Sequence, residues 1–370
     1  TYSDETKWAL DRCVMVRRDW MEKLGLSEPQ SFAEFRAMLD AFVNDDPDGD
    51  GRNDTQGLTA THLNTLEAVY LNLFPELSNT ERGWLYEDGR WMPVYCSSRT
   101  GAALEQMRLL YSDGLLDPQF AYTSTQEAAK AFAEGKVGAI CGQYYMVVNT
   151  MVKMGMLEQV DDLVQILPTF PCEDGERYRF TTSLHWSESY FGAGVDDEKM
   201  SVILSLYDWL LSDEFWTIYQ HGIEGVDWQR EEDGSITDLR EISPLREYTS
   251  LATLSHLVEW HQDEQYELND YNKLAYGEEN LLYARQWLEW FSQNTRRVGY
   301  NFDIVFMSTP SKNRLVYNSV VQEEMVKVIV GSEDARTAWP KAIDRLRAIT
   351  PLDDAIDEVT REASLLGVEP

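Results

Sequence analysis

Residues 126–145 read QEAAKAFAEGKVGAICGQYY and contain a helix, a turn and a strand in immediate succession. Small apolar residues recur at helical spacing from Gln126 to Glu134, and Gly135 is the residue type that most often ends a helix. The apolar run 137–141 is typical of a buried strand. Helices and short apolar strands alternate in this way along much of the chain, so the sequence predicts a layered α/β fold with a partly parallel sheet.

The flanking sequence extends this pattern in both directions. Ser31 followed by Glu34 predicts a capping box at a helix start, and Asp88-Gly89 between aromatic residues predicts a hairpin. Residues 229–245 are polar and rich in turn formers, which indicates a linker. Strands are expected at 12–17 and 163–167, and helices at 18–24, 102–110, 200–211, 215–221, 250–261, 277–292 and 318–330, with two more in 332–365 and a mostly helical stretch up to residue 74.

The composition excludes several function classes. The chain has 370 residues, enough for two domains, and its 32 basic and 64 acidic residues give a net charge of −32. So negative a surface repels phosphate backbones and anionic lipids, which argues against nucleic acid as a partner. Twelve Trp and 19 Tyr residues need either a core or a stacking surface, and sugar faces are natural stacking partners.

The cysteines and the start of the chain carry less information. Cys13, Cys96, Cys141 and Cys172 have no metal-binding spacing, and Cys141 lies in an apolar run that predicts burial. No stretch is long and apolar enough for a membrane span. The sequence begins at Thr1 without Met or a leader-like segment, so we expect either a removed signal segment or a start inside a longer protein.

An acidic loop gives the sharpest local signal. Its alternate side chains match the spacing of an EF-hand calcium loop, in which they converge on one hard cation. Gly57 stands at position 12, where an EF-hand has a bidentate Glu, and no flanking helix pair is evident. We therefore expect a structural calcium site rather than a sensor, the alternative being a solvated turn. The expected ligands, at positions 1, 3, 5, 7 and 9, are Asp46, Asp48, Asp50, the carbonyl of Arg52, and Asp54.

Four blocks of sequence, taken in order, resemble the extracellular solute-binding proteins of ABC importers, in the oligosaccharide and lipoprotein branch. The first runs from Val16 to Phe35 and resembles the opening of the second lobe. The others are the acidic loop with Gly57-Leu58, the segment 129–142, and the glycine-containing block 222–228. Members normally have a first α/β lobe before the first block, so the resemblance implies that much of that lobe is not represented.

The resemblance implies the fold class: an α/β, helix-rich, periplasmic-binding-protein-like two-lobe clamp (type II-like), with mostly the second lobe represented. Residues 1–170 would form a second-lobe segment with the calcium loop, 171–310 a crossover with first-lobe-type elements, and 311–370 helices returning to the second lobe. The implied function is capture of an oligosaccharide or another polar solute and delivery to ABC permease subunits, without catalysis. The implied protein is a monomer and is extracellular, as a cell-surface lipoprotein, or periplasmic. None of the four cysteines is in a position to be the expected lipid anchor.

The same resemblance and the local sequence suggest which residues contact the solute. The segment after Gly142 is where the family places a cleft aromatic residue, and Trp186 lies in a polar run with no apolar periodicity. Core packing is the competing interpretation for each aromatic residue. The expected ligand-binding residues are Tyr144, Tyr145, Trp186, Asp227, Trp228, Tyr317 and Asn318.

Two other function classes remain open at this stage. A glycoside-acting enzyme would also be acidic and aromatic-rich, with two carboxylates flanking the scissile bond, but no catalytic motif is present. A calcium-stabilised surface interaction module would have a macromolecular partner instead of a small solute. A peptide also remains possible as the solute.

Overall fold

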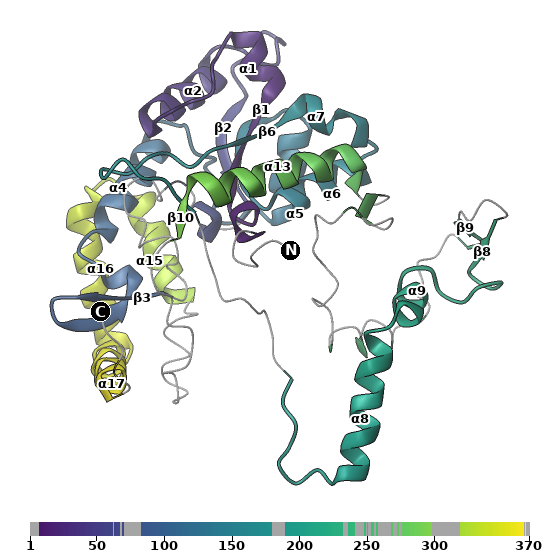
Figure 1. The fold of residues 1–370 in the computed structure, drawn as a ribbon. Coiled ribbons are helices and arrows are strands. Elements are labelled where there is room, and N and C mark those ends of the chain that lie inside the picture. The colour runs from purple at the N-terminus through teal and green to yellow at the C-terminus, as the bar shows by residue number, and fades with distance from the viewer. Residues whose placement is uncertain are drawn as a thin grey trace. The chain divides into compact units, whose positions relative to one another are not determined.

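The computed structural model describes residues 7–61, 63–66, 69, 83–179, 189–231, 236–240, 276–297, 319–365 and 367, with scattered positions at 248, 250, 253, 254, 257, 268, 272 and 273 (Figure 1). The chain divides into two compact units. Unit 1 comprises Thr1–Leu184 and Leu268–Pro370, and unit 2 comprises His185–Glu267. The predicted boundaries at 170 and 310 stay predictions.

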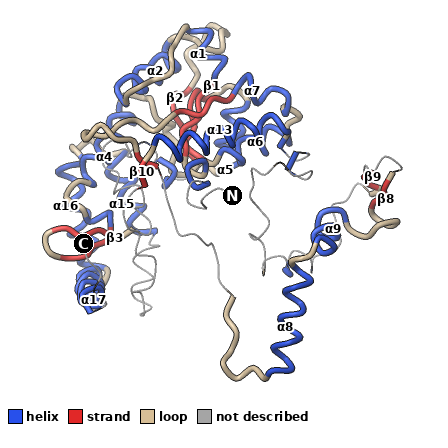
Figure 2. The backbone as a smooth tube through the Cα atoms, in the orientation of Figure 1, coloured by secondary structure: helices blue, strands red, loops and turns tan. Residues whose placement is uncertain are grey.

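A four-stranded mixed sheet lies at the centre of unit 1 (Figure 2). β5 (Val137–Gly142) lies between β2 (Gln56–Ala60), which is parallel to it, and β1 (Cys13–Arg17), which is antiparallel; β6 (Val164–Leu167) pairs antiparallel with β1. The partly parallel sheet expected from the sequence is confirmed. Because β2, β5 and β6 run in the same direction, their carboxyl ends share one edge, here called the carboxyl edge.

The strand β2 corrects the expectation that the chain is mostly helical after the acidic loop. Leu58 pairs with Ala139, and Ala60 pairs with Cys141. On its other side the Leu58 amide donates to the Leu115 carbonyl at 2.9 Å. This short segment has little strand propensity of its own, so hydrogen bonding on both sides decides its conformation. Much of the remaining expected helix lies outside the described residues.

The outer side of β6 is covered by α13 (Glu278–Asn294). The Ile166 amide points away from β1 and donates to the Tyr283 hydroxyl at 3.0 Å, while the Val164 carbonyl accepts from Arg18 at 3.4 Å. These side chains satisfy backbone groups that an open sheet edge would leave to solvent or to another chain.

Two helix starts show how local sequence sets the boundaries. The Ser31 hydroxyl caps α2 (Phe32–Asn44) by accepting from the Glu34 amide at 3.2 Å, but the Glu34 carboxylate accepts from the Gln30 amide instead of from Ser31. The capping box predicted there is therefore only half formed. A complete capping box, not predicted, joins Ser124 and Glu127 at the start of α5 (Thr125–Ala133).

The hairpin predicted around Asp88-Gly89 is confirmed. Helices of the C-terminal region pack on this hairpin and on one long helix. α15 (Ser319–Ile329) and α16 (Ala335–Ile349) contact α4 (Thr100–Ser112), and α17 (Leu352–Leu365) contacts β4 (Arg90–Pro93), the partner of β3 (Trp84–Glu87). Trp339 is buried, and its indole N–H donates to the Tyr95 carbonyl at 2.8 Å. The other described elements of unit 1 are α1 (Arg18–Leu24), α6 (Tyr144–Lys153), α7 (Val160–Leu163), β7 (Tyr178–Arg179), β10 (Arg296–Arg297) and short 3-10 turns at Lys7–Leu10, Leu63–Leu66, Val94–Cys96 and Leu157–Gln159.

A buried carboxylate joins α4 to α16. Glu105 forms two hydrogen bonds with Arg108, at 2.7 and 2.8 Å, and also accepts from the Ala335 amide at 2.8 Å, the first residue of α16. The hydrogen bonds from Arg108 have the largest effect and lower the pKa of Glu105. Burial raises it by less, so the pKa stays below its usual range. The carboxylate thus satisfies a free amide at the helix start.

Unit 2 contains two helices and a short hairpin. α8 (Asp197–Leu210) and α9 (Asp213–His221) pack around Leu210 and Phe215, with Trp209 and Trp216 half-buried beside them. The segment expected to be a linker instead includes β8 (Trp228–Arg230) and β9 (Ile236–Asp238), an antiparallel pair. The hairpin was not predicted because its residues are mostly polar and lack the apolar alternation of a strand. Within the described ranges of both units, no helix has the length and apolar content needed to cross a membrane.

Replacing Glu105 by Gln should lower the free energy of unfolding at neutral pH by about 1–3 kcal/mol, because a charged acceptor of a buried network is lost. A carboxylate with a depressed pKa stabilises the fold above its ordinary pKa, and this contribution disappears as pH falls through the folded-state value. The difference between the parent and Glu105→Gln should therefore shrink on acidification.

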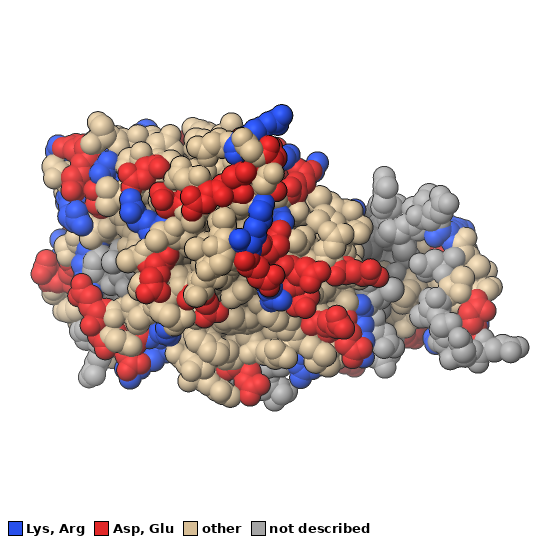
Figure 3. Space-filling model, turned by 90° about the horizontal axis from the view of Figure 1, so that it is seen from above, with Lys and Arg blue, Asp and Glu red and all other residues tan. Residues whose placement is uncertain are grey.

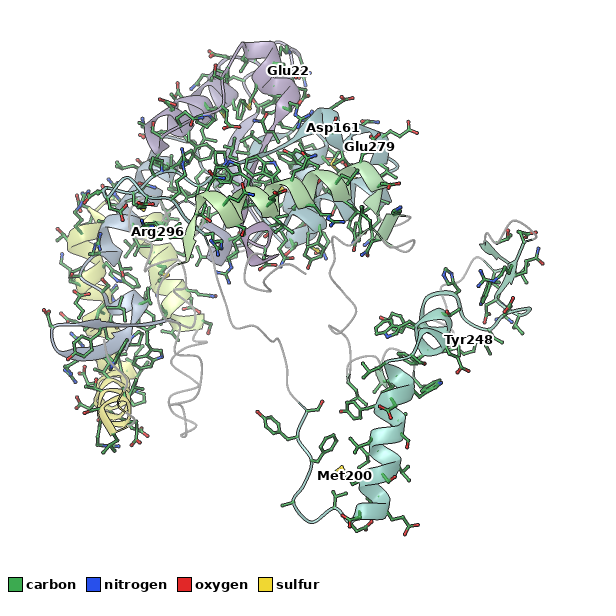
Figure 4. All side chains as sticks on the ribbon, viewed as in Figure 1. Glu22, Asp161, Met200, Tyr248, Glu279 and Arg296 are labelled. Atoms are coloured by element: carbon green, nitrogen blue, oxygen red, sulfur yellow. The ribbon has the colours of Figure 1, made fainter. Side chains whose placement is uncertain are left out.

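Urea unfolding at a series of pH values measures this difference. Glu22→Gln, at an exposed position on α1 labelled in Figure 4, is the control and should change little. A pH-independent difference would contradict a role for the ionised carboxylate.

Candidate functional site

The carboxyl edge of the unit 1 sheet brings together segments that are distant in sequence. Thr61 follows β2, Gln143 follows β5, and Asp11 precedes β1, whose amino end lies at the same edge. The Gln143 side chain donates a hydrogen bond to the Asp11 carboxylate. Ligands of open α/β sheets bind outside the carboxyl ends of the strands, so this edge is the candidate solute site of unit 1.

Tyr144 lies at this edge but is only 2% exposed. It is the first residue of α6, its hydroxyl donates to the Asn280 carbonyl at 3.4 Å, and its ring lies 6.0 Å from that of Tyr283. Burial raises the pKa of its hydroxyl well above the usual range. The tyrosine anchors the start of α6 against the start of α13. Tyr145, the next residue, is half-buried, and the ligand roles of both tyrosines stay predictions.

Asp227 and Trp228 belong to unit 2, where they stabilise the turn between α9 and β8. Asp227 accepts from the Ile223 amide at 2.8 Å and from the Tyr248 hydroxyl at 2.9 Å, and it pairs with Arg240 at 3.2 Å (Tyr248 is labelled in Figure 4). The bond from the Ile223 amide contributes most to a pKa of Asp227 below the usual range. The buried Trp228 indole donates to the Gly222 carbonyl at 3.1 Å.

The remaining predicted ligand residues, Trp186, Tyr317 and Asn318, lie outside the described residues. The predicted set is thus divided: two members lie at the carboxyl edge of unit 1 and two in the turn of unit 2. Their ligand roles stay predictions.

Sequence reasoning missed three residues at or near the carboxyl edge. Among the described side chains, the hydroxyls of Thr61 and Thr169 are buried without a hydrogen-bond partner, and each follows the carboxyl end of an outer strand, β2 and β6 respectively. Tyr122, in the loop before α5, is 88% exposed. Isolated threonines carry no sequence signal, whereas a tyrosine in a polar loop could have been noticed.

The acidic loop connects α2 directly to β2, so it joins a helix to a strand and not two helices. Carboxylate oxygens of Asp46, Asp48 and Asp50 lie within 4.8 Å of one another, which suits ligands of one ion, since two oxygens at calcium distances are at most about 5 Å apart. Asp54 is exposed and lies outside this group. The all-oxygen donor set fits a hard cation.

Two basic side chains lie beside the loop. The Lys23 ammonium donates to the Pro47 carbonyl at 2.7 Å, and Arg52 lies 3.7 Å from the Asp50 carboxylate. Gly51, at position 6, has φ +80°, as the sharp turn of such a loop requires. Backbone amides of Gly49 and Gly51 donate to Asp46, so the curled shape is formed by the chain itself.

The structure explains why position 12 of the loop is Gly57. This residue lies within β2, and a Cβ atom there would lie 2.5 Å from the Leu115 carbonyl oxygen. No side chain fits at this position, so the carboxylate that completes an EF-hand shell cannot come from it.

Acidic side chains are spread over the face of the molecule shown in Figure 3, with basic side chains interspersed. This distribution agrees with the net charge of −32.

Comparisons of fold show that the chain is similar to solved structures of solute-binding proteins. The S. pneumoniae ABC-transporter substrate-binding protein FusA in complex with kestose has a TM-score of 0.61 at 14% identity, covering 99% of this chain and 74% of FusA. The alginate-binding protein AlgQ2, in a structure without calcium ion, has a TM-score of 0.58 at 12% identity, covering 94% of this chain and 71% of AlgQ2. A further FusA structure is that of an EF-hand mutant. The predicted fold class is confirmed.

Two curated relatives from Bacillus subtilis (strain 168) match in sequence. The polygalacturonan/rhamnogalacturonan-binding protein YtcQ is 24% identical over 66% of this chain, and lipoprotein LipO is 24% identical over 68% of it. The chain spans about half the length of these relatives, 48% of YtcQ and 51% of LipO. No protein-family model matches. The resemblance to sugar-binding ABC solute-binding proteins is confirmed by these relatives together with the fold.

Gly57→Ala should destabilise unit 1 by about 1–3 kcal/mol, because the added methyl group meets backbone that cannot move without disturbing β2. Thermal unfolding followed by circular dichroism measures the loss. Gly194→Ala is the matched control, since its Cβ would have no neighbour within 4 Å and its φ is not in the left-handed region. Equal unfolding temperatures for the two variants would contradict the close approach of Leu115.

Proposed function

We propose that this protein is the extracellular solute-binding component of an ABC transporter, which captures an oligosaccharide and delivers it to membrane permease subunits. The single observation that carries the proposal is the carboxyl edge: three strands in the same direction end together beside tyrosine, threonine and glutamine side chains. Planar polar side chains can pair with sugar hydroxyls, and aromatic rings can stack on the apolar faces of sugars.

The comparisons support an oligosaccharide as the solute. YtcQ is named for binding polygalacturonan and rhamnogalacturonan, and FusA was solved with kestose. In our proposal Tyr145 contacts the bound solute at the carboxyl edge. The other proposed solute contacts come from Trp186, Asp227, Trp228, Tyr317 and Asn318. Tyr144 acts mainly by holding the start of α6 in place.

In our proposal the protein binds its solute as a monomer and does not change it chemically. It lies outside the cytoplasmic membrane, either anchored by lipid or free in a periplasm. The relatives and fold neighbours are binding proteins by name, and LipO is a lipoprotein. These names support the proposed localisation and argue against an enzyme.

We also propose that the acidic loop holds a structural calcium ion. Asp46, Asp48 and Asp50 would bind it through carboxylates, with the Arg52 carbonyl and Asp54 as further ligands. The ion would offset the repulsion among the carboxylates and fix the connection between α2 and β2. AlgQ2 without calcium ion and the FusA EF-hand mutant support calcium as the metal.

Isothermal titration of the chain against a panel of oligosaccharides should give saturable binding, with no cleavage products on prolonged incubation. Chromatography of the sugars after incubation checks the second point. Cleavage would replace the transport proposal by a glycoside-acting enzyme, and a macromolecular partner in the absence of any sugar binding would favour an interaction module.

Calcium should raise the unfolding temperature of the parent protein, and chelation should reverse the increase. Asp48→Asn removes one charged ligand and should abolish most of this shift, whereas Asp40→Asn, on the exposed face of α2, should retain it. Differential scanning calorimetry with and without calcium distinguishes the two variants. A calcium response that survives Asp48→Asn would place the ion elsewhere.

A further inference from the structure

The helix α8 of unit 2 is apolar over most of its circumference. At 3.6 residues per turn, its side chains fall into four rows along the helix axis. One row is polar and contains Ser201, Ser205 and Asp208. A helix with so wide an apolar surface is typical of a protein interior, since a surface helix has an apolar stripe of about 100°. The three apolar rows are Val202-Leu206-Trp209, Ile203-Tyr207-Leu210 and Met200-Leu204-Leu211.

The described part of the chain covers little of this apolar surface. The middle row packs at its carboxyl end, where Leu210 lies against Phe215 and the Tyr207 ring lies 5.8 Å from that of Phe191. Within α8 only Leu210 is buried, and the rows on either side of it are open to solvent. The exposed fractions are 67% for Val202, 49% for Leu204, 38% for Leu206 and 38% for Leu211.

Local sequence explains where α8 begins but not why it is stable. The Asp196 carboxylate caps the first turn by accepting from the Lys199 amide at 2.8 Å, and Asp197 and Glu198 suit the helix dipole there. An isolated helix of about this length is marginal in water, because packing of the apolar face normally supplies most of its stability. The helix therefore requires a cover.

Unit 2 as a whole has the same deficit. Among the described residues, ten large apolar side chains of unit 2 are exposed, against seven in the much longer unit 1. Its core cluster is centred on two buried residues, Leu210 and Phe215. Small units bury a low fraction of their surface and are marginally stable. Unit 2 therefore has the properties of one part of a larger domain.

The fold comparisons indicate a source for the rest of that domain. The alignments cover almost all of this chain but 74% of FusA and 71% of AlgQ2. About a quarter of each of these structures thus has no counterpart in the chain. A segment of the same polypeptide also docks without the entropic cost of bringing two molecules together.

A second copy of the chain suits this surface less well. A stable interface between two proteins buries about 800 Å² on each partner, which is more than four partly exposed side chains of one helix provide. The net charge of −32 also opposes association between copies.

The charges beside the apolar rows indicate the chemistry of the occupant. Asp197, Glu198 and Asp208 are exposed on α8, and Lys199 is its basic side chain. An apolar surface bordered by Lys or Arg residues would complement this mostly acidic border.

We propose that Val202, Leu204, Leu206 and Leu211 form a docking surface, here called the α8 face, for the part of the two-lobe fold that this chain does not span. The occupant is a segment of the same polypeptide with an apolar centre and a basic border. This inference rests on the fold and on the exposure of α8, and it does not depend on the identity of the solute.

The test compares the 370-residue chain with the protein expressed from its complete gene. Val202→Gln should leave the unfolding temperature of the chain unchanged, since Val202 is exposed there and Gln is a better helix former than Val. The same substitution should lower the unfolding temperature of the longer protein by about 2–6 °C, because it places an amide in a buried apolar contact.

Ile349→Gln is the matched control. Ile349 is the last residue of α16 and is also 67% exposed, so this variant should unfold like the parent in both proteins. Nile red, an uncharged dye that fluoresces on apolar surfaces, gives a second readout. Its fluorescence should be higher with the chain than with the longer protein, and Val202→Gln should reduce it in the chain alone.

Three results would overturn the proposal. An unchanged unfolding temperature of the longer protein with Val202→Gln would show that the α8 face is not docked there. A loss of stability in the 370-residue chain itself would show that the face is already covered, by another segment or by a second copy, which sedimentation at several concentrations distinguishes. A complete gene that encodes no further part of the two-lobe fold would remove the occupant.

Discussion

The pairing of β5 on both sides is the constraint on which unit 1 depends. Its residues are buried throughout, and hydrogen bonds to β2 and β1 satisfy its backbone on either side. Buried backbone groups without partners are strongly unfavourable, so the register of these three strands is closely specified. That register also brings the ends of β2 and β5, and the start of β1, to one edge.

Small residues make this arrangement possible. A Cβ on Gly138 would lie 2.2 Å from the Phe42 ring and 2.9 Å from that of Trp20, so the strand can approach these rings only with glycine at this position. At the end of the same strand, a Cβ on Gly142 would lie 2.6 Å from Thr61. The close approach that packs the core therefore also sets the position of the Thr61 side chain at the carboxyl edge.

The two candidate sites depend on opposite uses of carboxylates. In the acidic loop three carboxylates converge, which favours a hard cation among them. At the carboxyl edge, Asp11 and Glu127 instead accept hydrogen bonds from the neighbouring polar groups of Gln143 and Ser124.

The sequence by itself determined the elements whose signals are local. Gly135 after an amphipathic run, Asp88-Gly89 between aromatic residues, and the spacing of Asp46, Asp48 and Asp50 depend on neighbours a few residues away, so the helix end, the hairpin and the acidic cluster were all predictable. The order of four motifs also carried the resemblance to solute-binding proteins.

Only the tertiary structure decided the features that depend on distant partners. β2 is a strand because β5 and Leu115 form hydrogen bonds with it, and Tyr144 is buried because α13 packs against it. The Thr61 hydroxyl is unpaired because no donor or acceptor among the described residues reaches it. Short strands have weak preferences of their own, and the burial of an aromatic residue depends on what packs over it. Such contacts join residues tens to hundreds of positions apart, and no local pattern encodes them.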